Sequence, residues 1–186
     1  MTKHGIVRSA CSLGAVCALV LVTSPAAAQS SAVHKPRSAD QSFIDMMVPH
    51  HQQASEMAQR AVAKATRPEV KQLAQKMLDE QGKEIAQLKN WRRQWFGSDS
   101  TPPAMRSAEM PSGPEFDRIW LREMIKHHGM GVTVAEITER STARAQIKQI
   151  ATKTSNSQHE DRHKMAAWLM QWYNEPAPVA APPRKN

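Results

Sequence analysis

The sequence predicts an all-α protein, a four-helix bundle built from two copies of one helical hairpin. When the chain is displaced by 77 residues it aligns with itself, and fourteen of the 58 positions from 40 to 97 are identical without a gap. Within each copy, apolar residues recur every three to four positions, as they do along one face of an α-helix. Alternating β-branched runs and Asn-Gly or Asp-Gly turns are missing. Four amphipathic helices of this kind pack as a bundle.

Residues 1–28 have the pattern of a secretory signal peptide. Lys3 and Arg8 precede an apolar run, and the small residues up to Ala28 suit cleavage by signal peptidase. We therefore expect a periplasmic or secreted protein. Both cysteines, Cys11 and Cys17, lie in this segment, so the mature chain offers no thiolate to a metal. The polar, aperiodic residues that follow, 29–39, are expected to form a disordered tail.

The chain is basic, with 25 Lys and Arg against 17 Asp and Glu. These charges are interleaved along helix faces and form no basic patch, which argues against binding to nucleic acid. No apolar run after residue 28 is long enough to span a bilayer. We expect no nucleic-acid partner and no integral membrane segment once the signal peptide is removed.

The first repeat, residues 40–97, is predicted to form two helices. The stripe of the first helix consists of Phe43, Met47, His50, Ala54, Met57 and Ala61. The pattern breaks before Pro68, a residue suited to the first turn of a helix. The stripe of the second helix consists of Val70, Leu73, Met77, Gln81, Glu84, Leu88, Trp91 and Trp95.

The second repeat, residues 117–174, follows a linker, residues 98–116, that is rich in Pro, Ser and Gly. Its stripes repeat those of the first copy and consist of Trp120, Met124, His127, Gly131 and Val134, then Ile147, Ile150, Thr154, Gln158, Asp161, Met165, Trp168 and Trp172. Residues 175–186 are Pro-rich and are predicted to form a second disordered tail.

Ionisable and amide side chains occupy the centre of these apolar stripes. In the first repeat they are His50, Gln81 and Glu84, with His51 on the flank of the stripe. Their equivalents in the second repeat are His127, Gln158, Asp161 and His128. A buried ionisable group must be paired or bound to a metal, because an isolated buried charge is too costly for a small domain.

The height of these residues along the helices predicts which of them meet. His50 lies about 10 Å along the helix from Phe43, which brings it level with Glu84 in an antiparallel hairpin. The same reasoning pairs His127 with Asp161, and pseudo-twofold symmetry places both pairs in one layer. Either these pairs fix the register of the helices or the layer binds a transition metal, and the repeated His-His dipeptide favours the metal.

The predicted metal ligands are His50, His51, Glu84, His127, His128, Asp161, Met47, Met57 and Met124. Imidazole suits Cu(II) and zinc, and thioether selects Cu(I). We therefore expect copper, as Cu(I) or Cu(II), with zinc as an alternative. Because protonated imidazole cannot coordinate, binding is expected to weaken between about pH 7 and pH 5.

The motif Met-Val-Pro-His-His at residues 47–51, followed by Gln81, Glu84 and Trp91, resembles the family called domain of unknown function 305. The resemblance extends over both repeats. It implies a ferritin-like four-helix bundle in a family that is often exported and includes periplasmic copper-binding proteins linked to copper resistance. It also implies copper sequestration or delivery, with other periplasmic copper-handling proteins as partners and no established catalytic activity.

The second repeat departs from the family pattern, because Lys126 replaces the proline and Asp161 replaces the glutamate. Two other functions stay open beside a non-enzymatic copper-binding protein. A ferritin-like di-metal oxidase would need Glu on two helices and Glu-x-x-His on the others, whereas only Glu84 and Asp161 are central carboxylates here. A structural or interaction bundle would keep its His–carboxylate pairs without metal. The sequence leaves the oligomeric state open.

Overall fold

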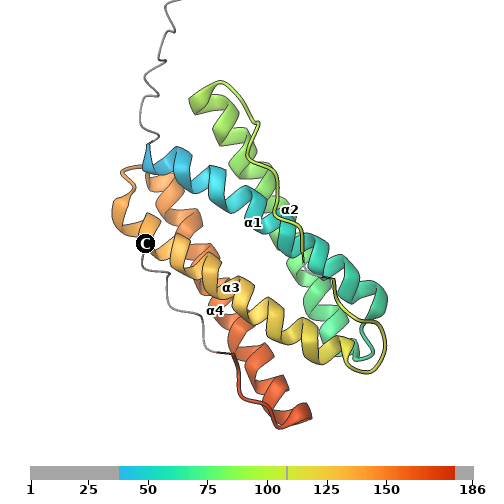
Figure 1. Ribbon diagram of the computed structural model, residues 1–186. Coiled ribbons are helices and arrows are strands. Elements are labelled where there is room, and N and C mark those ends of the chain that lie inside the picture. The colour runs from blue at the N-terminus through green and yellow to red at the C-terminus, as the bar shows by residue number, and fades with distance from the viewer. Residues whose placement is uncertain (1–37, 108, 179–186) are drawn as a thin grey trace, which may run out of the picture. The chain divides into compact units, whose positions relative to one another are not determined.

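Four α-helices make up the computed structural model, which describes residues 38–107 and 109–178. They are α1 (Ala39–Lys64), α2 (Pro68–Phe96), α3 (Phe116–Ser141) and α4 (Ala145–Tyr173) (Figure 1). No strand occurs within the described residues. The predicted all-α bundle of two helical hairpins is therefore confirmed. None of the helices in the described part of the chain combines the length and the apolar character needed to cross a membrane.

The observed helix bounds differ by one residue from the predicted segments. Ala39, expected in the tail 29–39, is the first residue of α1, and Phe116, expected in the linker 98–116, is the first residue of α3. The predicted signal peptide, residues 1–28, lies outside the described residues. So do residues 29–37 and 179–186 of the two predicted tails.

The helix ends follow local sequence signals. Ser38 caps α1 by accepting a hydrogen bond of 3.1 Å on its hydroxyl from the backbone N–H three residues later. Pro68 begins α2, as predicted. Gly97 and Asn174, which are equivalent in the two repeats, end α2 and α4 in the left-handed conformation, with φ of 78° and 51°. Gly and Asn are the residues that adopt this conformation most readily.

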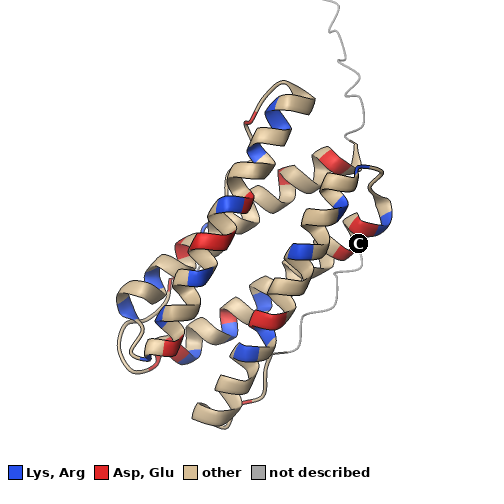
Figure 2. Ribbon diagram, turned by 180° about the vertical axis from the view of Figure 1, so that it is seen from behind, with Lys and Arg blue, Asp and Glu red and all other residues tan. Residues whose placement is uncertain are grey.

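The two hairpins, α1 with α2 and α3 with α4, meet through α1 and α3. In Figure 1 the α1 and α3 face is toward the viewer, and Figure 2 shows the opposite face, on which α2 and α4 lie. Acidic and basic residues are interspersed along the helices in Figure 2. The interior contact between the hairpins is thus made mainly by the first helix of each repeat.

The hydrophobic core consists of two clusters. One packs the C-terminal half of α1 and the N-terminal half of α2 against the N-terminal half of α3 and the C-terminal half of α4, and its large members include Met57, Met77, Phe116, Trp120, Met124 and Met165. The other packs the remaining halves and includes Phe43, Ile44, Met47, Leu88 and Ile147. Each cluster therefore maps onto the other when the repeats are exchanged, and α1 and α3 run antiparallel. Polar side chains separate the two clusters.

Two arginines make cation–π contacts that join the hairpins away from this polar region. Arg67, immediately before α2, lies 4.0 Å from the ring centroid of Trp172 on α4. Arg144, immediately before α4, lies 4.3 Å from the ring centroid of Trp95 on α2. The two contacts are equivalent under the repeat, and each contributes about 0.5–1 kcal/mol at an exposed site. They fasten each end of the bundle across the hairpins.

Candidate metal centre

Four imidazole rings gather between the two core clusters. His50 and His51 come from the middle of α1, and His127 and His128 come from the middle of α3. The ring centroids of His50 and His127 lie 3.9 Å apart. Each of these rings lies close to its sequence neighbour, at 5.9 Å for the α1 pair and 6.2 Å for the α3 pair. The structure therefore brings all four predicted histidines into one row, which we call the histidine row.

The carboxylates meet the second histidine of each dipeptide. Nε2 of His51 lies 2.9 Å from Oε2 of Glu84, and Nε2 of His128 lies 3.7 Å from Oδ2 of Asp161. The first distance is a hydrogen bond and the second is too long for one. Successive side chains on a helix point about 100° apart. Because α1 and α3 contact each other as well as their own hairpin partners, one histidine of each dipeptide faces each neighbour.

His50 and His127, predicted to pair with Glu84 and Asp161, face each other instead, so that pairing is wrong. Nε2 of His50 donates to the backbone carbonyl of His127 at 3.0 Å. Nε2 of His127 lies 3.2 Å from Oε1 of Gln53. Since a carbonyl oxygen can only accept, these contacts place the ring proton on Nε2 and leave a lone pair on Nδ1. Nδ1 is thus the atom through which either ring could bind a metal.

The Nδ1 atoms of all four rings fit the requirements of a metal ligand. Among the described residues none of these buried atoms has a hydrogen-bond partner, and Nε2 of His128 also has none. A buried nitrogen without a partner costs about 1–3 kcal/mol, and coordination to a metal would satisfy it. Neutral imidazole is a ligand for copper and zinc alike.

The row is nevertheless not a preformed coordination site. Within the described parts of the chain, no three His, Cys, Asp or Glu side chains are placed to hold one metal ion. The rings of His50 and His127 overlap with an interplanar angle of 31°, so their lone pairs, which lie in the ring planes, do not point at a common centre. Binding one ion with both rings requires a change in their side-chain rotamers.

Each carboxylate also forms an ion pair with a lysine of the other hairpin. Nζ of Lys76 on α2 lies 3.1 Å from Oδ1 of Asp161 on α4. Nζ of Lys153 on α4 lies 3.3 Å from Oε1 of Glu84 on α2. Neither lysine was among the residues predicted from the sequence, although they are identical residues at equivalent positions of the two repeats. The same identity holds for Lys71 and Lys148, so it does not single out Lys76 and Lys153 in the sequence.

The local environment keeps both carboxylates ionised. Burial would raise the pKa of Glu84, but the hydrogen bonds from His51 and Thr154 and the charge of Lys153 outweigh it, so this pKa is lowered. Burial would likewise raise the pKa of Asp161, and its neighbours His128 and Lys76 outweigh it. Opposite charge and hydrogen bonding favour the ionised form of an acid.

The same burial keeps the facing imidazoles neutral. Burial, and next the charge of His51, lowers the pKa of His50 from 6.5 to about 3. Burial, and next the charge of His50, lowers the pKa of His127 to about 2. The pKa of His128 is also lowered, first of all by burial. Protons therefore compete for these rings at a lower pH than the range of about 7 to 5 expected from an ordinary imidazole.

Two residues near the row make its close packing possible. Gly131 on α3 has no side chain, and a Cβ there would lie 2.2 Å from Oε1 of Gln158 and 2.6 Å from Cε1 of His50. Gln158 is 2% exposed, and both of its amide atoms lack a hydrogen-bond partner among the described residues. A glycine inside a helix is unfavourable unless close approach requires it, so Gly131 was a detectable signal in the sequence.

The three predicted thioether ligands lie in the hydrophobic clusters on either side of the row. Met47 belongs to one cluster, and Met57 and Met124 belong to the other; all three are at most 4% exposed. Apolar packing accounts for these positions, since methionine fills irregular gaps in a core. Their role as metal ligands stays a prediction.

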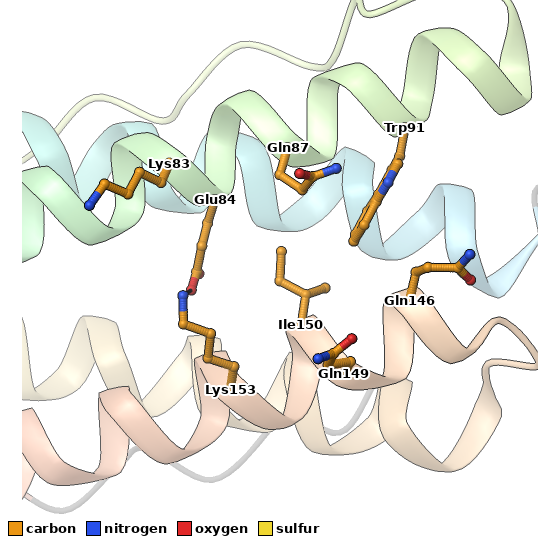
Figure 3. Close-up of a pocket in the computed structure, with 8 residues that line it drawn as sticks. All are labelled: Lys83, Glu84, Gln87, Trp91, Gln146, Gln149, Ile150 and Lys153. Carbon is orange, nitrogen blue, oxygen red and sulfur yellow. Dashed lines mark ion pairs between the residues drawn. The ribbon is translucent and has the colours of Figure 1, made fainter.

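Two open grooves lie between α2 and α4, one lined by Glu84 and Lys153 and the other by Lys76. The first groove, of about 280 Å³, is lined by Lys83, Glu84, Gln87, Trp91, Gln146, Gln149, Ile150 and Lys153. Figure 3 shows Glu84 and Lys153 pointing toward each other across it, while Lys83 points away. A second groove, of about 270 Å³, is lined by Glu69, Gln72, Leu73, Lys76, Lys164 and Trp168. These residues are equivalents of the first set, so each cross-hairpin ion pair borders a groove.

A comparison with known proteins identifies the family. The profile described as Domain of unknown function (DUF305) matches residues 40–116, 100–169 and 117–185. The chain belongs to the DUF305 family. No curated protein gives a significant match to this DUF305 chain.

Solved structures resemble this DUF305 protein over most of its length. CopM in the Cu(I)-bound form is 37% identical, with a TM-score of 0.66, over 74% of this chain and 99% of the CopM chain. CopM in the apo form is 39% identical, with a TM-score of 0.67, over 72% and 98% of the two chains. A DUF305 protein of Streptomyces coelicolor, described as secreted, is 23% identical with a TM-score of 0.68 over 76% and 96%. This last likeness concerns the fold.

Proposed function

We propose that this DUF305 protein binds copper at the histidine row and carries it as cargo, for sequestration or delivery in the periplasm. The observation that carries the proposal is the meeting of four imidazoles whose buried Nδ1 atoms have no hydrogen-bond partner among the described residues. Such a cluster is costly in a core and becomes favourable once a metal satisfies the nitrogens. Glu84 holds the ring of His51, as carboxylates commonly do for metal-binding histidines.

The choice of copper rests on the comparisons and on ligand chemistry. CopM has been crystallised in Cu(I)-, Cu(II)- and Ag-bound forms, and its identity with this chain is above a third. Imidazole with nearby thioether accommodates both oxidation states of copper. Zinc also binds imidazole, so each test of this proposal compares copper with zinc.

The proposal assigns no catalytic role. Glu84 and Asp161, the two carboxylates next to the row, are each bound to a lysine. A di-metal oxidase needs several carboxylates directed at two metal ions. Oxygen consumption by the copper- or iron-loaded protein would contradict this part of the proposal.

The test is a copper titration of the exported protein with thermal unfolding as the readout. Wild-type protein is compared with H50A/H127A and with the control H159A/H163A, which removes two histidines from α4 where His159 is 42% exposed. We expect copper to raise the Tm of the wild type and of the control, by an amount equivalent to about 3–4 kcal/mol at a large excess over Kd. The double variant at the row should keep its helical circular dichroism and lose the response.

A different result would favour the structural bundle. In that case copper leaves the wild-type Tm unchanged, and the apo H50A/H127A variant is already unfolded because its helices depended on the imidazole contacts. Elemental analysis of the protein purified from the periplasm is an independent test. We expect it to find more copper than zinc bound to the protein.

A further inference from the structure

The ion pairs of Lys76 and Lys153 exchange partners between the two hairpins. Each lysine extends from the second helix of its own repeat to the carboxylate on the second helix of the other repeat. The side chains of Glu84 and Asp161 are 7% and 3% exposed, whereas those of Lys153 and Lys76 are 63% and 34% exposed. Two buried anions are thus neutralised by two ammonium groups that reach in from the grooves.

This arrangement changes which cation the histidine row can accept. Without the lysines, two buried carboxylates would offset the charge of a divalent ion. With the lysines in place, any bound ion adds its full charge to a buried region. The cost of burying an ion rises with the square of its charge, so a divalent ion is penalised far more than a monovalent one.

The lysines also limit the ligand set. Oxygen ligands favour hard divalent cations, whereas imidazole and thioether suit soft ions such as Cu(I). Oδ1 of Asp161 and Oε1 of Glu84 are each bound to a lysine, and Oε2 of Glu84 accepts hydrogen bonds from His51 and Thr154 at 2.9 Å. Both oxygens of Glu84 and one oxygen of Asp161 are therefore engaged by neighbours, which leaves the imidazoles as the main donors.

We propose that Lys76 and Lys153 determine the metal selectivity of the histidine row, making it prefer a soft monovalent cation, Cu(I) or Ag(I), over divalent ions such as zinc. This inference rests on the proposed function, because it concerns the selectivity of the same site. The two lysines are not metal ligands themselves. They affect the bound ion through their ion pairs with the two carboxylates.

The experiment compares the affinities of the full exported protein for Ag(I) and Zn(II), two probe ions that do not change oxidation state. The variant K76Q/K153Q removes both ion pairs. The control K83Q/K164Q removes the same charge from the same two grooves. Within the described residues neither of these lysines forms an ion pair with Glu84 or Asp161, and Lys83 points away from Glu84 in Figure 3. Circular dichroism verifies that each variant retains its helices.

We expect K76Q/K153Q to raise the affinity for Zn(II) relative to Ag(I) by about tenfold or more, and the control to leave the ratio within about threefold of the wild type. The single variant K153Q, whose altered side chain is mostly exposed, should shift the ratio in the same direction by less. An unchanged ratio in K76Q/K153Q, or an equal shift in the control, overturns the inference while leaving the proposed function intact. A wild-type protein that binds neither ion contradicts the proposed function itself.

Discussion

The two halves of the histidine row are built from equivalent residues but are held differently. We call His51 with Glu84 the first half-site and His128 with Asp161 the second half-site. In the first, the imidazole and carboxylate form a hydrogen bond of 2.9 Å. In the second they are 3.7 Å apart, and neither ring nitrogen of His128 has a hydrogen-bond partner within the described residues. Repetition of a sequence motif has therefore produced one satisfied pair and one unsatisfied pair.

Two substitutions between the repeats account for the difference. Asp161 is one methylene shorter than its equivalent, Glu84, and does not reach the ring. Thr154 donates a hydrogen bond of 2.9 Å to Glu84, whereas its equivalent beside the second half-site is Met77, which has no hydroxyl. The first half-site thus contributes to stability without a ligand, and the second has the most to gain from one.

The largest expected effect is on stability when a carboxylate is removed. E84A strands the buried ring of His51 and the hydroxyl of Thr154, and we expect a loss of about 3–5 kcal/mol in the free energy of unfolding. D161A should cost only about 1–2 kcal/mol, because His128 is already unbonded and the half-exposed Lys76 can turn to Glu80, 3.8 Å away. Urea denaturation of the apo variants measures both. Equal losses would mean that the half-sites do not differ energetically.

The next effect concerns acid. In the folded protein the pKa values of His50 and His127 are lowered to about 3 and about 2, but both histidines titrate near 6.5 when unfolded. The unfolded state therefore binds more protons below pH 6.5, and stability falls as the pH falls, by at most about 1.4 kcal/mol per pH unit for each histidine. Above pH 4.5 the carboxylates contribute little to this pH dependence. Their pKa is lowered in the folded protein, so the stability that they provide is lost only at lower pH.

This expectation is tested by unfolding curves between pH 6.5 and 4.5. H50Q and H127Q should each flatten the dependence on pH, and the double variant should leave only the smaller dependence that His128, whose pKa is also lowered, contributes. A wild-type stability that is constant over this range would show that the rings are not buried in neutral form.

A smaller effect separates Gly131 from its equivalent in the first repeat, Ala54. G131A places a methyl group 2.6 Å from a ring carbon of His50, and we expect a loss of about 1–3 kcal/mol from overpacking. A54G should cost about 1 kcal/mol through helix propensity. We also expect the two variants to differ in copper affinity. Only G131A should displace an imidazole and so change the affinity. Stabilisation by G131A would contradict the close approach of Gln158 and His50 to α3.

The smallest expected effect repairs the second half-site. D161E lengthens the side chain to that of the first repeat, and a new hydrogen bond to His128 should stabilise the apo protein by about 1 kcal/mol. The same change should weaken metal binding slightly, because a ring nitrogen of His128 that now has no partner would already be hydrogen-bonded. Thermal unfolding with and without copper measures both. A destabilised D161E would indicate that the gap between Asp161 and His128 is not set by side-chain length.

The fold and the location of the site were predictable because both depend on periodicity. The repeat and the helical spacing predicted that His50, Glu84, His127 and Asp161 lie at one height along the bundle. In the structure these residues lie in the polar layer between the two hydrophobic clusters. Which histidine meets which carboxylate was not predictable. Neighbouring residues such as His50 and His51 both border the apolar stripe, and the rotation of each helix is set by tertiary packing that one sequence does not reveal.

The lysines were missed for a different reason. Lys76 and Lys153 lie outside the apolar stripes, and charged residues at such positions usually face solvent. Their long side chains reach the buried carboxylates from the grooves. Their identity across the repeats did not distinguish them either, because Lys71 and Lys148 are also identical residues at equivalent positions of α2 and α4.

The most direct test of the central claim is a crystal structure of the copper-loaded protein with anomalous scattering measured at the copper edge. If copper binds at the histidine row, the map should show a copper peak between α1 and α3, bound through Nδ1 of His50 or His127, with the centroids of these two rings farther apart than 3.9 Å. We also expect that Lys76 and Lys153 still hold Asp161 and Glu84. Copper found only at surface positions such as His159 and His163, with the histidine row unchanged, would contradict the claim.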